Sequence, residues 1–151
     1  MNDRDFVNYE ELLQNEGVLI APNVGKSMMP LLRENYDIMV IKKKGAERCK
    51  KYDAVLYKSR GRYVMHRVIK VRENDYVIVG DNCRVLEYGI TDDNILGVLV
   101  AVLRGGKREL KCDSFILKLY AHLWCDFFPV RAFLIFLREK FVKIAKLILK
   151  K

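Results

Sequence analysis

The strongest constraint on the fold is a series of short runs rich in Val, Ile and Tyr that fills the middle of the chain. Turn signals such as Lys44-Gly45, Arg60-Gly61 and Gly105-Gly106 separate the runs, as expected for strands joined by hairpins. No long helical pattern lies between them, and parallel strands would need such crossovers. We therefore expect a mostly β protein with a small, curled, antiparallel sheet. The expected strands cover residues 18–24, 36–42, 54–58, 63–71, 76–79 and 95–103.

Helical periodicity marks the N-terminal end of the chain. Apolar residues from Phe6 to Leu13 recur at helical spacing, which predicts a short helix over residues 6–14. Asp3 or Asp5 is a suitable cap for its start, and Gly17 for its end.

The C-terminal part has a different texture. Its pattern predicts one helix over residues 114–128 and, after Pro129, an amphipathic helix over residues 130–149. From Ser114 onward there are eight Lys and Arg against two acidic residues, a net +6 of the total +9. We expect a domain over residues 1–113 followed by a basic amphipathic tail over residues 114–151.

The composition also limits the chemistry. Four cysteines are widely spaced with no C-x-x-C pair, and with two histidines they form no zinc-site spacing. We expect no metal, no cofactor and reduced thiols in a cytoplasmic protein. The polar, acidic start of the chain has no apolar segment like a signal peptide or anchor before residue 27.

Two residues are candidates for nucleophilic catalysis. Ser27 lies in a small-residue turn that ends at Pro30, where a hydroxyl projects while neighbouring amides stay free for an oxyanion. A serine nucleophile needs a base, and histidine is suited to that near pH 7. His66 lies in a predicted strand, where it could equally be a packed histidine. Asp81, at the end of a predicted strand, and Glu87 are candidates to orient it.

Four segments together resemble a known family. Residues 25–30 resemble the Ser-Met-x-Pro box of type I signal peptidases and their LexA-like relatives, and residues 51–55 resemble their Gly-Asp-[Ile/Val]-Val segment, with Tyr52 where glycine is usual. Residues 65–69 resemble the segment that carries the general base, and residues 80–82 the Gly-Asp-Asn box. The segments occur in the family's order, and the resemblance spans about residues 17–106.

The resemblance implies roles for these residues. His66 precedes Arg67-Val68, as in the archaeal and endoplasmic-reticulum type, whereas the bacterial type has a lysine there. Lys70 is a weaker alternative base. The family's orienting acid usually lies six residues beyond the Gly-Asp-Asn aspartate, where this chain has Glu87, so Asp81 and Glu87 both stay open.

The implied function is a serine endopeptidase that cleaves a signal-like or leader-like peptide after a small residue. Turn amides at Ser27, flanked by Lys26 and Met28, would hold the oxyanion or substrate. The alternative is a non-catalytic peptide-binding or regulatory domain on the same scaffold. The basic tail would lie on a membrane surface or pack on the sheet or a second copy. Its apolar face is too broad for a helix that reads nucleic acid.

Overall fold

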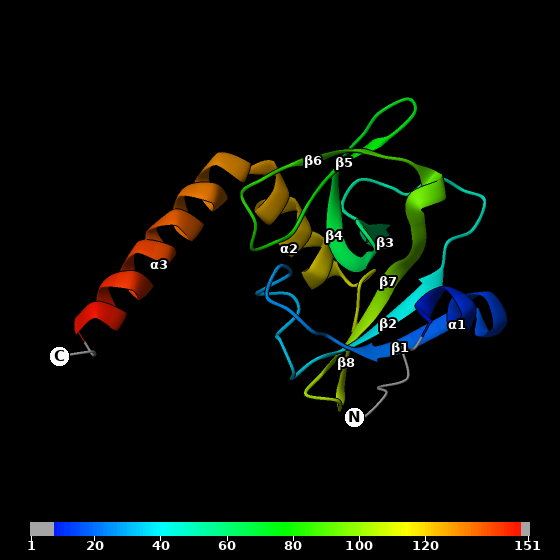
Figure 1. Cartoon of the computed structure of the whole chain (residues 1–151), viewed down its shortest axis with the longest axis horizontal. Helices are drawn as coiled ribbons and strands as arrows, with labels where there is room; N and C mark the ends of the chain where they lie inside the picture. The colour runs from blue at the N-terminus through cyan, green and yellow to red at the C-terminus, as the bar shows by residue number, and fades with distance from the viewer. Residues whose placement is uncertain (1–7, 149–151) are drawn as a thin grey trace.

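The computed structural model describes residues 8–148, which form one open antiparallel sheet with helices at both ends of the chain (Figure 1). Every strand pair is antiparallel, and β1 and β6 lie at the two edges of the sheet. The expected mostly β class and its flanking helices are therefore confirmed. In sheet order the strands are β1 (Val18–Pro22), β2 (Ile38–Lys43), β7 (Ile95–Arg104), β3 (Ala54–Ser59), β4 (Arg62–Val71), β5 (Tyr76–Val79) and β6 (Glu87–Ile90), while β8 (Arg108–Lys111) pairs with β7.

Apolar side chains pack in two clusters. The larger includes Leu32, Ile41 and Val102, all with no exposed surface, and the second is built around Val55 and Val68. Neighbouring residues of a strand face opposite sides of the sheet, so a strand such as β3 contributes to both clusters. This arrangement fixes which side each polar residue of the strands faces.

Two strands were not predicted. β6 (Glu87–Ile90) and β8 (Arg108–Lys111) are short, and their sequences lack the runs of Val and Ile that mark the other strands. β6 pairs with β5, and β8 forms a hairpin with β7 through Gly105-Gly106. The Gly105-Gly106 turn signal was expected, but the strand after it was not.

Helix α1 (Tyr9–Glu16) begins later than expected. The side chain of Asn8 caps it by accepting hydrogen bonds from the amides of Glu10 and Glu11, and Gly17 ends it in the left-handed conformation. Phe6 and the expected caps Asp3 and Asp5 lie outside the described residues.

The C-terminal segment forms α2 (Phe115–Asp126) and α3 (Phe128–Ile148), close to the expected ranges. Pro129 lies in the first turn of α3, where a missing amide hydrogen costs nothing. The helices are bent by 86° relative to each other. Leu117 and Tyr120 of α2 pack against the larger core cluster, whereas the C-terminal part of α3 extends away from the sheet (Figure 1). The expected limit between residues 113 and 114 lies just before α2, and α2 itself packs against the core of residues 1–113 that the structure describes.

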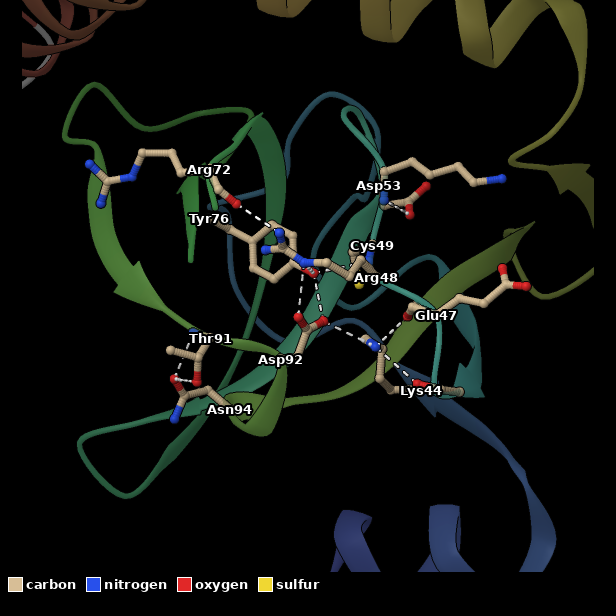
Figure 2. A network of polar contacts seen from close by, with 12 residues as sticks. Lys44, Glu47, Arg48, Cys49, Asp53, Arg72, Tyr76, Thr91, Asp92 and Asn94 are labelled. Carbon is tan, nitrogen blue, oxygen red and sulfur yellow. Dashed lines mark hydrogen bonds and ion pairs between the residues drawn. The ribbon is translucent and has the colours of Figure 1, made fainter. Parts of the chain in front are cut away.

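A polar network holds the long segment between β2 and β3 (Figure 2). Arg48 donates hydrogen bonds to the hydroxyl of Tyr76, to Asp92 and to the carbonyls of Arg72 and Glu73. Asp92 also accepts from Tyr76 at 2.5 Å, and it pairs with Lys44 at 3.1 Å. Each charge has an opposite partner, so we interpret the network as structural.

Candidate functional site

Ser27 lies in the loop between β1 and β2, and hydrogen bonds hold this loop at both ends. Asn23 donates to the carbonyl of Gly25 at 3.1 Å. Asp37, which is 1 % exposed, accepts from the amide of Arg33 at 2.8 Å and from the Arg104 guanidinium at 2.8 Å. Burial alone would raise the pKa of Asp37, but these bonds outweigh it and the pKa is lowered. The serine is therefore carried on a fixed turn.

The Gly-Asp-Asn segment supports the same turn from the other side. The amide of Asn82 donates to the carbonyl of Ser27 at 2.7 Å, and its side chain donates to the carbonyl of Lys26 at 3.0 Å. Two of the segments singled out in the sequence, far apart in the chain, are thus in direct contact.

His66 lies on β4 opposite Val55 of β3, and it is 8 % exposed. Its Nδ1 lies 2.7 Å from Oε1 of Glu87 and 3.1 Å from the hydroxyl of Tyr57. The Tyr57 hydroxyl donates to the other Glu87 oxygen at 2.8 Å. Glu87 is therefore the carboxylate that contacts His66, and Tyr57 is a third member of the cluster that the sequence did not indicate.

These contacts determine the protonation of His66. Burial lowers its pKa below 6.5, and the charge and hydrogen bond of Glu87 offset this only in part. The ring is therefore neutral at pH 7. Because Nδ1 faces the carboxylate, we assign the ring proton to Nδ1. Nε2 then carries the free lone pair that a general base requires.

Gly80 brings the serine and histidine segments together. A Cβ placed on Gly80 would lie 2.7 Å from the carbonyl oxygen of Ser27 and 3.0 Å from Cδ2 of His66. Only a residue without a side chain fits between them. Within residues 8–148 the Ser27 hydroxyl and the His66 ring do not form a hydrogen bond. Catalytic hydrogen bonds are often long without substrate and shorten in its complex.

The turn also offers free amides. Among the described residues, the backbone N–H groups of Ser27 and Met28 donate no hydrogen bond. Met28 is 1 % exposed, and its side chain belongs to the larger core cluster. Lys26 is largely exposed and pairs with Glu34 at 3.3 Å.

Asp81 does not contact His66. Its carboxylate is fully buried and forms a bidentate pair with Arg67, both distances being 2.7 Å. Tyr120 of α2 donates to the same carboxylate at 2.9 Å. Burial lowers the pKa of Arg67, but the Asp81 charge outweighs it and the pKa is raised. Asp81 therefore supports the segment that carries Asn82.

The alternative base, Lys70, does not lie where it was expected. Lys70 is exposed, and a bulge between Val68 and Lys70 interrupts the alternation that was expected to align it with His66. A lysine base must be desolvated to be neutral near pH 7, and this exposed position does not desolvate Lys70.

Tyr52 stands where the family usually has glycine. It has a φ of 79°, the left-handed conformation that favours glycine.

Metal-ligating and thiol side chains near the cluster are limited in the chemistry that each could supply. In the described part of the chain, no group of three or more His, Cys, Asp or Glu side chains could hold a metal ion. Cys83 lies beside Ser27, but burial raises its pKa and keeps the thiol protonated at neutral pH.

His66 and Glu87 line a groove of about 570 Å³. Asn82, Arg84 and Val85 also line it, together with Glu139 of α3. Ser59 also borders the groove. The C-terminal helix therefore forms part of the wall of the candidate site.

The sequence matches no protein-family model, and no curated protein matches it.

Proposed function

We propose that this protein is a serine endopeptidase, related to signal peptidases, in which Ser27 is the nucleophile and His66 the general base. The observation that carries the proposal is the pairing of His66 Nδ1 with Glu87 at 2.7 Å, beside the loop that holds Ser27. This pairing leaves Nε2 as the proton acceptor and supplies a negative charge that stabilises the imidazolium formed during reaction.

The reaction would proceed by acyl transfer. His66 Nε2 takes the proton of Ser27 Oγ as the oxygen attacks the peptide carbonyl carbon. The free amides of Ser27 and Met28 stabilise the negative oxygen of the tetrahedral intermediate. The imidazolium then protonates the leaving amine as the C–N bond breaks. Water, deprotonated by His66, hydrolyses the ester, and Ser27 regains its proton.

The substrate class follows from the resemblance of residues 25–30 and 80–82 to the family's motifs. We propose a signal-like or leader-like peptide cleaved after a small residue and bound extended. An open sheet with unpaired edges is compatible with that mode, because a peptide can add to a sheet as a strand.

The test uses the full chain with a fluorophosphonate probe and with leader-like peptides analysed by mass spectrometry. Labelling and cleavage should occur in the wild type and be lost in Ser27→Ala. Ser114→Ala is the control, since Ser114 lies at the start of α2 and its side chain forms no capping hydrogen bond. Equal results for wild type and Ser27→Ala would refute the peptidase. Saturable peptide binding without cleavage would instead support a peptide-binding domain on this scaffold.

A further inference from the structure

The two sides of the C-terminal helices differ sharply in their contacts. Toward the protein, Ala121 and Cys125 of α2 and Ile135 of α3 are buried. Elsewhere on these helices many large apolar side chains are exposed to water, and such side chains mark an interaction site where they gather on one face. The exposed ones on the two helices and at their junction are Phe115, Ile116, Leu119, Leu123, Phe127, Val130, Phe133, Leu134, Phe136, Phe141, Val142 and Ile144.

Polar contacts fix the inner side of the helices to the candidate site. Trp124 donates to the carbonyl of Asp81 at 2.7 Å, and Arg131, which is 2 % exposed, donates to the carbonyl of Cys83 at 2.8 Å. Glu139 of α3 pairs with Arg84 at 3.0 Å, and both residues line the His66 groove. The segment that carries the exposed apolar surface is therefore attached to the segment that supports Ser27.

By length and composition alone, α2 and α3 together could also be a membrane span that is broken at the bend between them. Among the described residues no single helix is long and apolar enough to cross a membrane, although α2 and α3 pass that test together with their 86° bend. A span would place the junction of the helices in lipid. The bonds of Trp124 and Arg131 place this junction on the protein, so α2 and the start of α3 lie against the domain.

Charge identifies what covers the outer side. Successive helical residues are 100° apart, so Arg138 and Lys140 lie on opposite borders of the stripe that contains Leu137 and Phe141. Apolar residues bordered by cations are typical of helices that lie in an anionic lipid interface. A second copy of this chain, whose net charge is +9, would bring like charges together.

We propose that the outer side of α2 and α3 docks on an anionic membrane surface and presents the His66 groove at that surface. The membrane docking is inferred from the exposed side chains and does not depend on the proposed function. The presentation of the groove to membrane-bound peptides does rest on the proposed function.

The test is co-sedimentation of the full chain with vesicles of phosphatidylglycerol and phosphatidylcholine. The double variant Phe133→Glu, Phe141→Glu should bind at least about tenfold more weakly, because two exposed apolar anchors are lost. Ile20→Glu is the control, since Ile20 is 64 % exposed on β1. Arg138→Gln with Lys140→Gln should weaken binding about tenfold. Lys107→Gln with Arg108→Gln, at the β7–β8 hairpin, should have little effect.

The outcomes separate the two proposals. Ser27→Ala should bind vesicles as tightly as the wild type does. If the wild type binds vesicles but cleaves no peptide, the peptidase proposal is refuted and the docking proposal still holds. Equal binding by wild type and the Phe133, Phe141 variant would overturn the docking. So would a wild-type dimer that binds no vesicles and becomes monomeric in that variant, since the surface would then join two copies.

Discussion

The Nδ1 atom of His66 lies 2.7 Å from Oε1 of Glu87, and His66 is 8 % exposed. In this setting the carboxylate orients the ring and stabilises the charged form that the proposed mechanism requires. Burial works in the opposite direction, since it favours the neutral ring. The balance yields a base that is unprotonated at rest and accepts a proton when one is offered.

Replacing Glu87 by Gln should lower kcat about 10²- to 10⁴-fold with little change in KM, because the amide cannot stabilise the imidazolium. Glu87→Asp should retain more activity, since it keeps the charge. The measurement is steady-state cleavage of a leader-like peptide. Equal rates for Glu87→Gln and wild type would mean that Glu87 has no role in the reaction.

The pH dependence of kcat/KM should report the titration of His66. Activity requires the neutral ring, and burial lowers its pKa, so activity should rise with pH and reach half its plateau below pH 6.5. Glu87 raises this pKa, so Glu87→Gln should move the half-point to still lower pH. A shift toward higher pH in that variant would contradict this assignment of charges.

Replacing Tyr57 by Phe should lower kcat about tenfold and stability by about 0.5–1.5 kcal/mol, because Glu87 loses the hydroxyl that donates at 2.8 Å. Tyr57 acts through Glu87, so it is a positioning residue. The distinguishing measurement is the pH profile, whose acid limb should move relative to wild type. A loss of stability with unchanged kinetics would make the hydroxyl purely structural.

Sequence reasoning proposed Ser27 and His66 because each lies in a local motif, but it could not say whether Asp81 or Glu87 contacts His66. The choice depends on which side of β4 each partner faces. His66 and Arg67 are adjacent and point to opposite faces, so one meets Glu87 and the other meets Asp81. That pairing is a property of the assembled sheet.

Tyr57 escaped prediction for a related reason. In the sequence it is one apolar residue of a strand, and only the arrangement of β3, β4 and β6 brings its hydroxyl to Glu87. Strands β6 and β8 were missed because they are short and largely exposed, and backbone pairing with β5 and β7 forms them. Tyr52, in contrast, was noticed in the sequence because it stands where the family usually has glycine. The structure gives it a left-handed φ, the conformation that glycine adopts easily.

Replacing Asp81 by Asn should reduce the free energy of unfolding by about 3–5 kcal/mol, because it leaves the buried guanidinium of Arg67 without its counter-charge. The measurement is urea denaturation followed by circular dichroism. Asp75→Asn is the control, since Asp75 pairs with Arg72 at the surface and its loss should cost much less stability. Similar losses for both variants would show that the Asp81 pair is not the main support of this segment.

Replacing Gly80 by Ala should disturb the site directly. The added methyl group would lie 2.7 Å from the Ser27 carbonyl oxygen and 3.0 Å from Cδ2 of His66, and the Ser27 backbone cannot move without breaking its bond from Asn82. We expect a stability loss of about 1–3 kcal/mol and a loss of peptide cleavage. Gly45→Ala is the control, because a Cβ there meets nothing within 4 Å. Full activity of a folded Gly80→Ala protein would mean that the Ser27 and His66 segments are not held together at this residue.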